Sequence, residues 1–266
     1  MNTIIIPTDF SATAENAMHY GAKLAGLMNA SVLLVHVYQV PINMNEAPVM
    51  MIAPEELKNS ADKGLERLRE ELQQAYNGLN VAIESRLGDL NEELQDLCKE
   101  RDPFAVVIGS KGIRGFERML FGNTSLSVIR HAHYPVITVP EKYTGFATER
   151  IVLAADFKTD APLPVEHIKT IVRELKAKLH IVHIAQEGDT SNPDAFLHQL
   201  KEINTSYKSI AHSDVLKGLQ TFMQQEAADM LLIFPHDHTL FERLFFRLHA
   251  EDIITSLEVP VMAIKC

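Results

Sequence analysis

Residues 106–140 read VVIGSKGIRGFERMLFGNTSLSVIRHAHYPVITVP, the part of the chain that is most informative about the fold class. It begins with a short apolar run and continues through a glycine-rich segment. A polar segment then predicts a helix over Asn123–Ala132, and a second β-branched run follows at Val136–Val139. A strand, a helix and a strand in this order favour parallel pairing through a right-handed crossover. The stretch therefore predicts an α/β protein.

The same alternation extends back to residue 3. Short apolar runs predict buried strands, and the capped or amphipathic segments between them predict helices. The predicted strands are Thr3–Pro7, Ser31–Val37, Val81–Arg86, Phe104–Ile108 and Val136–Val139. The first predicted helix begins near Ser11, and the other three cover Glu55–Ala75, 90–100 and Asn123–Ala132. Five strands in this order fit an open, doubly wound parallel-sheet sandwich of the Rossmann-like kind.

A second copy of this pattern follows the first. Residues 231–265 read LLIFPHDHTLFERLFFRLHAEDIITSLEVPVMAIK, so an offset of 125 places Phe116-Glu117-Arg118 on Phe241-Glu242-Arg243. Strands are predicted near 150–155, 179–184, 207–211, 230–234 and 259–264. We therefore predict two tandem five-stranded domains, at 1–143 and 148–266. The first copy carries a methionine-rich insertion near 41–54, which we expect to be a loop against the sheet edge; a lid or a partner surface is the alternative.

Composition narrows the classes of function. The formal charge is −10, with 35 acidic and 25 basic residues, which disfavours a general nucleic-acid binder. The two cysteines, Cys98 and Cys266, make no disulfide framework and suit a reducing compartment. The apolar runs are far shorter than the ~18 residues that span a bilayer, and the first residues lack the basic region of a signal peptide. We expect a cytoplasmic protein without a membrane partner.

The candidate site lies where predicted strands end. In an open parallel sheet, ligands bind outside the carboxyl ends of the strands, and Asp9 and Gly109 follow the first and fourth strands. Glycines free backbone N–H groups, and a helix N-terminus favours anions, so Gly112 and the helix start at Asn123 complete a phosphate cradle. A glycine-rich turn before a capped helix explains the same residues without a ligand, and both readings stay open.

The run Gly109-x2-Gly112-x9-Gly122 resembles the nucleotide-binding signature of the universal stress protein family. The start Ile4–Ser11, the strand Leu33–Val37 and the end Pro135–Pro140 also resemble that family. The resemblance covers the whole first copy and, more loosely, the second. It implies an adenine-nucleotide α-hydrolase-like fold and a tandem, two-domain member of the family.

The resemblance also implies roles for single residues. Asp9 is expected near the adenine and ribose, Val37 contacts the base through its backbone, and Ile108 lines the pocket. The groups expected around the ribose and phosphates are Gly109, Gly112, Gly122, Asn123, Thr124 and Ser125. The family has Ser or Thr directly after the last glycine, whereas this chain has Asn123. The implied ligand is ATP or another adenine nucleotide, with or without Mg²⁺.

The second copy has lost these residues. Phe234 stands at the position of Gly109, and Asp237 at that of Gly112, so we predict a degenerate domain without a nucleotide. Members of the family pair through their last strands. The resemblance therefore implies an intramolecular pseudo-dimer with 136–140 beside 260–264, and a homodimer of the whole chain stays open.

The leading hypothesis is a stress-response regulatory protein that binds an adenine nucleotide in its first domain and signals to an unknown protein partner. The alternatives are an interaction module without a nucleotide and a weak ATP hydrolase. No G-x-x-x-x-G-K-[ST] or G-x-S-x-G motif is present, and we predict no catalytic residues. We predict no metal site either, because His236, His238 and His249 indicate no complete ligand set.

Overall fold

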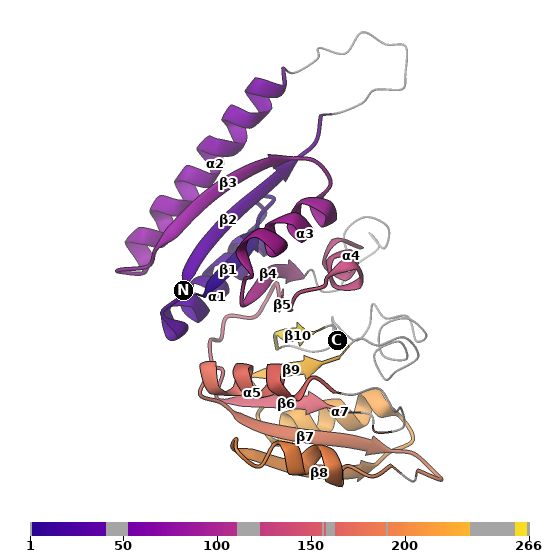
Figure 1. Cartoon of the computed structure of the whole chain (residues 1–266). Helices are drawn as coiled ribbons and strands as arrows, with labels where there is room; N and C mark the ends of the chain where they lie inside the picture. Colours follow the sequence, from indigo (N-terminus) through magenta and orange to yellow (C-terminus); the bar gives the residue numbers. More distant parts are fainter. Residues whose placement is uncertain are drawn as a thin grey trace, which may run out of the picture.

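The computed structural model describes residues 2–40, 53–110, 123–155, 157, 163–189, 191–234 and 259–264. Strands and helices alternate along the first half of the chain (Figure 1). The strands are β1 (Thr3–Pro7), β2 (Ser31–Tyr38), β3 (Val81–Leu87), β4 (Ala105–Ser110) and β5 (Val136–Pro140). The helices are α1 (Ala12–Met28), α2 (Pro54–Ala75), α3 (Leu90–Arg101) and α4 (Asn123–His131).

The second half repeats the alternation. Its strands are β6 (Arg150–Ala154), β7 (Lys178–Ala185), β8 (Thr205–Ala211), β9 (Met230–Ile233) and β10 (Val261–Ala263). Its helices are α5 (Val165–Glu174), α6 (Asp194–Gln199) and α7 (Val215–Gln225). The predicted strands agree with these bounds to within about two residues. The strand predicted to end at Ile108 continues to Ser110, because Gly109 and Ser110 pair with the end of β5.

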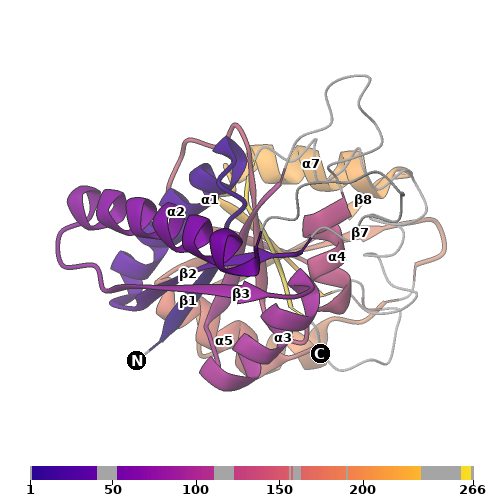
Figure 2. The same cartoon turned by 90° about the horizontal axis from the view of Figure 1, so that it is seen from above.

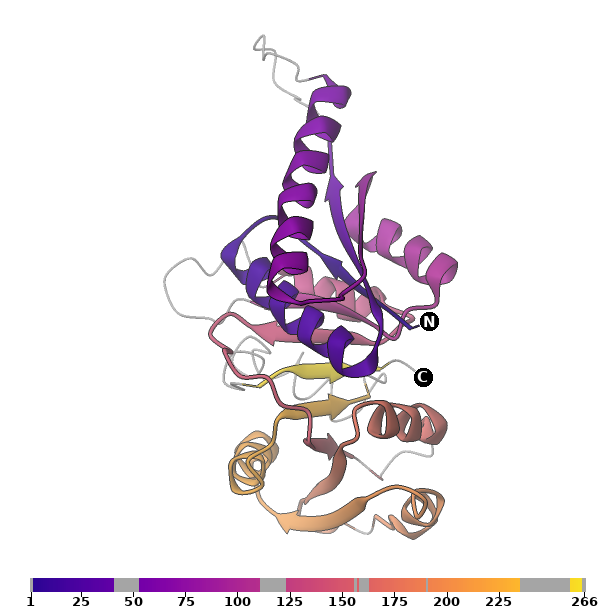
Figure 3. The same ribbon diagram turned by 90° about the vertical axis from the view of Figure 1, so that its left-hand side faces the viewer.

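The ten strands form one sheet in the order β3-β2-β1-β4-β5-β10-β9-β6-β7-β8. Pairing is parallel within each half and antiparallel between β5 and β10, where Ile137 lies opposite Met262. Figure 3 shows β10, in yellow, between β5 and β9. The predicted side-by-side placement of 136–140 and 260–264 is confirmed, and the two five-stranded sheets are continuous. This pairing covers two strand edges that would otherwise invite association with other chains.

Helices cover both faces of the sheet. Successive strand residues point to opposite faces, so Ile4 and Ile6 belong to one buried cluster and Ile5 to the other. Helices α1, α2, α5 and α6 pack on the first face, and α3, α4 and α7 on the second. Figure 2 shows α2 and α3 on opposite sides of β3. Burial on both faces explains why the strands read as continuous apolar runs.

The helices are amphipathic and not uniformly apolar. For example, α2 buries Ala61, Leu65, Leu68 and Leu72 on one face and exposes charged residues on the other. Within the described part of the chain, no helix combines the length and the apolar character needed to cross a membrane.

The segment between the two halves is held by α1. The Asn16 side-chain amide donates to the carbonyl oxygens of Pro140 at 3.0 Å and Tyr143 at 3.1 Å. One turn further along, the Tyr20 ring packs edge-on against Tyr143 and Phe146, with ring centroids 5.9 and 5.4 Å apart. Burial raises the pKa of Tyr20 far above its usual value, and the nearby Tyr143 adds to this shift. The Tyr20 hydroxyl therefore stays neutral.

The two halves also repeat one hydrogen bond. His36 Nδ1 donates to the Thr8 carbonyl oxygen at 2.7 Å, and His183 Nδ1 donates to the Ala155 carbonyl oxygen at 3.0 Å. Each imidazole thus ties the second strand of its half to the residue that follows the first strand. This correspondence supports the internal repeat found in the sequence.

Met262→Ala tests the seam between the halves. Met262 is fully buried and belongs to a cluster that extends across both halves, so its truncation leaves a cavity. We expect the free energy of unfolding to fall by about 2–5 kcal/mol, measured by urea unfolding followed by circular dichroism. We also expect one cooperative transition that shifts as a whole, because the core is continuous.

The matched control is Leu27→Ala, because Leu27 is 40% exposed. Its effect should stay within about 0.5 kcal/mol. If the protein unfolded in two separate steps and Met262→Ala shifted only one of them, the result would contradict a shared core.

Candidate functional site

A pocket with a cavity volume of about 150 Å³ opens at the carboxyl ends of β1 and β4. These strands are neighbours in the sheet, with β2 on the far side of β1 and β5 on the far side of β4. The pocket therefore lies at the point where the strand order reverses, the usual ligand position in open α/β sheets. It is lined by Pro7, Thr8, Asp9, Ser11, Thr13, Ala14, Val37, Leu90, Ile108, Gly109, Thr124 and Ser125.

The structure brings most of the residues predicted for the site to this pocket. Those that line it are Asp9, Val37, Ile108, Gly109, Thr124 and Ser125. Asn123 is the first residue of α4, immediately before Thr124. Gly112 and Gly122 lie outside the described residues, as do most of the methionine-rich insertion and His236, His238 and His249.

A tight turn between β1 and α1 forms one wall. Thr8 Oγ1 accepts the backbone N–H of Phe10 at 3.0 Å, and Asp9 Oδ1 accepts that of Ser11 at 3.0 Å. Phe10 has a φ of 63°, in the left-handed region that non-glycine residues rarely adopt. Ser11 Oγ then accepts the N–H of Ala14 at 3.3 Å and caps α1. The turn leaves the Asp9 carboxylate exposed at the rim with one oxygen engaged.

Half of the lining was not predicted from the sequence. These residues are Pro7, Thr8, Ser11, Thr13, Ala14 and Leu90. The sequence contains a pattern that indicates most of them. A helix that starts directly after β1 must begin at the carboxyl edge of the sheet, so its first residues lie at the candidate site. Leu90 follows Asp89, which caps α3 through the N–H of Asn91 at 2.8 Å, and so opens a helix at the same edge.

Gly109 has a packing role that the sequence analysis did not identify. A Cβ placed on it would lie 2.5 Å from the carbonyl oxygen of Thr13 and 2.8 Å from its Cγ2. The bare backbone of β4 thus lets the first turn of α1 press against the strand. The sequence pattern predicts that this glycine makes room for a ligand, and the helix–strand contact requires the missing side chain even without one.

The pocket combines two kinds of surface. The first turns of α1 and α4 contribute N–H groups without intrahelical partners, and helix N-termini carry partial positive charge. Small hydroxyl side chains accompany them: Thr8, Ser11, Thr13, Thr124 and Ser125. The apolar lining comes from Pro7, Ala14, Val37, Leu90 and Ile108. This arrangement suits a ligand with one apolar part and one anionic or hydroxyl-bearing part.

The second half differs at the matching position. Phe234, directly after β9, aligns with Gly109 near the end of β4. The Phe234 ring is buried in the core and is 6% exposed. Its side chain rules out the bare-backbone contact that Gly109 allows. Asp237, Arg247 and Leu248, which align with the other motif positions, lie outside the described residues.

Residues 1–140 match the family model described as the Universal stress protein family. A universal stress protein of Mycolicibacterium smegmatis is 29% identical over 140 residues, which are 51% of this chain. The aligned part spans 47% of that relative, so this chain covers about half of its length.

Solved structures extend the likeness to the second half. The crystal structure of a universal stress protein from Archaeoglobus fulgidus covers 99% of this chain and 98% of its own, with a TM-score of 0.74 and 19% identity. At that identity the likeness concerns the fold, which is a tandem arrangement of two such halves. A universal stress protein solved in complex with cAMP covers 52% of this chain at 17% identity and a TM-score of 0.41. That similarity is too low to say what this chain binds.

Gly109→Ala and Gly26→Ala form a matched pair. The added methyl at residue 109 meets the backbone of Thr13, so the free energy of unfolding should fall by about 1–3 kcal/mol. A methyl at Gly26, inside α1, meets nothing within 4 Å and should stabilise by about 0.5–1 kcal/mol. Chemical denaturation of both variants measures the difference. A Gly109→Ala protein as stable as the parent would disprove the close contact.

Proposed function

The chain belongs to the universal stress protein family, and on that premise we propose that its first half binds ATP or a related adenine nucleotide. The protein then acts as a stress-response regulator in the cytoplasm. The observation that carries this proposal is the pocket between β1 and β4, where apolar lining and two helix N-termini meet.

The chemistry of the lining supports a nucleotide. The apolar side chains of Val37 and Ile108 suit the faces of a purine, and we assign the backbone of Val37 to its edge. The hydroxyls of Thr124 and Ser125 and the first-turn N–H groups of α4 suit phosphate oxygens. The cavity of about 150 Å³ is below the ~300–1,000 Å³ of common ligand pockets, so we assign part of the nucleotide to it. Gly112 and Gly122 complete the proposed site.

A regulatory role fits these residues better than turnover. The described lining contains one carboxylate and several hydroxyls, and among these residues there is no histidine, lysine or cysteine. A hydroxyl nucleophile needs an adjacent base, and among the described residues the hydrogen bond of the Asp9 carboxylate goes to a backbone N–H and not to a hydroxyl. We assign Asp9 to the ribose or to a Mg²⁺ ion that accompanies the phosphates, and we assign no catalytic residue. The bound nucleotide changes the surface that a protein partner meets.

Thr124→Glu, with Thr124→Gln as its matched control, tests this proposal. Thr124 is exposed in the first turn of α4, where a carboxylate favours the helix and the fold is retained. A negative charge near the phosphates should weaken ATP binding about tenfold or more, whereas glutamine, with the same size, should change it little. Isothermal titration with ATP and Mg²⁺ measures both. Adenosine, which carries no phosphate, should bind the two variants alike.

Three other outcomes decide between the hypotheses. Mass spectrometry of molecules released from the denatured, freshly purified protein identifies any nucleotide that copurifies at about one per chain. A folded protein that carries none and takes up no ATP would refute the proposal and favour the interaction module. Phosphate release above background that Asp9→Ala abolishes would favour the weak hydrolase.

A further inference from the structure

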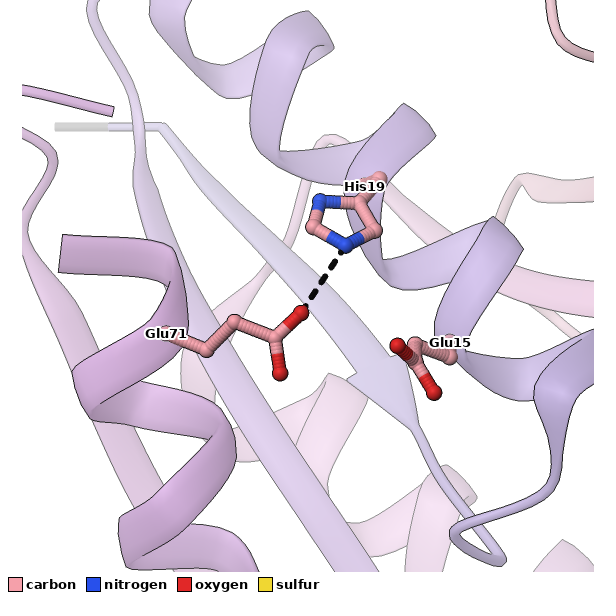
Figure 4. A group of neighbouring side chains, drawn as sticks. All are labelled: Glu15, His19 and Glu71. Carbon is pink, nitrogen blue, oxygen red and sulfur yellow. Dashed lines mark hydrogen bonds and ion pairs between the residues drawn. The ribbon is translucent and has the colours of Figure 1, made fainter. Parts of the chain in front are cut away.

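Three side chains of metal-ligating types converge between α1 and α2, and none of them lines the pocket (Figure 4). Glu15 and His19 lie four positions apart on α1 and so share one face of the helix. Glu71 projects towards them from α2. The three ligand atoms, two carboxylate oxygens and one imidazole nitrogen, lie within 4.8 Å of one another.

Tyr76 contacts the ring nitrogen of His19 that does not face Glu71. Tyr76 donates its hydroxyl hydrogen to the backbone oxygen of His19 at 3.5 Å, and its hydroxyl oxygen lies 3.2 Å from His19 Nδ1. In the tautomer that carries the ring hydrogen on Nδ1, this oxygen accepts it. In the neutral ring, Nε2 then presents a lone pair. A hydrogen bond to the non-ligating nitrogen is the usual support of a metal-bound histidine.

Nε2 faces an acceptor and not a donor. It lies 3.1 Å from Glu71 Oε1, and the Glu15 carboxylate lies on the same side. A lone pair and two carboxylates repel one another unless a proton or a cation lies between them. Within the described part of the chain, no lysine or arginine forms an ion pair with Glu15 or Glu71. Among the described residues, the two carboxylates therefore have no lysine or arginine partner, and Glu71 contacts only the His19 ring.

We infer that Glu15, His19 and Glu71 bind a divalent first-row transition metal of the zinc type. One imidazole nitrogen and two carboxylate oxygens are ligands that Zn²⁺ accepts at about 2.0–2.2 Å, and water fills the remaining position. The two negative charges match the charge of the ion. The side chains of His19 and Glu71 are 32% and 38% exposed, so an ion can enter from solvent.

The expected effect of the metal is to join two helices. The ligands come from α1, whose first turn lines the pocket, and from α2, which precedes β3. Binding to the folded state alone stabilises that state, so Zn²⁺ should raise the melting temperature. No local spacing in the sequence indicates this cluster, because Glu71 stands 52 residues beyond His19.

Zinc titration of the metal-stripped full chain tests the inference. Isothermal titration without nucleotide should show one strong site per chain. Glu15→Gln, His19→Gln and Glu71→Gln should each weaken it at least tenfold, and Tyr76→Phe about tenfold, because it releases the ring. His167→Gln is the matched control, since His167 is exposed on α5, and should leave the affinity unchanged. Circular dichroism checks that each variant folds.

Two results would overturn the inference. One is the absence of strong zinc binding, which would leave Glu15, His19 and Glu71 as a hydrogen-bonded cluster without a metal. The other is binding that survives all three ligand substitutions, which would place the ion among the other histidines of the chain. If a ligand variant fails to fold, X-ray absorption of the zinc-loaded parent decides. One imidazole with oxygen ligands supports the site, and two or more imidazoles refute it. None of these results depends on ATP binding.

Discussion

The antiparallel pairing of β5 with β10 is the contact on which the architecture depends. Each half alone would end in an exposed strand edge, and the pairing converts two such edges into the middle of one sheet. The buried clusters on both faces then run through the seam, with Ile137 and Met262 in the same cluster. The two repeats are therefore coupled by backbone hydrogen bonds and by shared apolar burial.

Helix α1 links the separate parts of the first half. Its first turn presses on Gly109 and lines the pocket, and Asn16 and Tyr20 hold the segment that leads to the second half. Its remaining face brings Glu15 and His19 towards α2. The pocket, the segment between the two halves and the proposed metal cluster therefore all use residues or contacts of this one helix.

The repeats have diverged without losing their framework. His36 and His183 make the same hydrogen bond in both halves, which preserves the second strand and the turn after the first. At the end of the fourth strand the halves differ, because Gly109 leaves its backbone bare and Phe234 fills the equivalent position with a buried ring. The framework residues support folding in both halves, whereas the bare backbone is kept where α1 and the pocket need it.

The order of strands and helices, the repeat and the edge of the sheet where the candidate site lies could all be predicted from the sequence. Strands buried on both faces must be apolar along their whole length, and helices must carry one apolar stripe, so both leave a local pattern. Which distant residues meet became apparent only from the three-dimensional packing. It placed Thr13 against Gly109, Leu90 in the pocket lining and Glu71 beside His19. Such contacts depend on how helices pack across the sheet, and packing between residues far apart in the chain leaves no periodic trace in a single sequence.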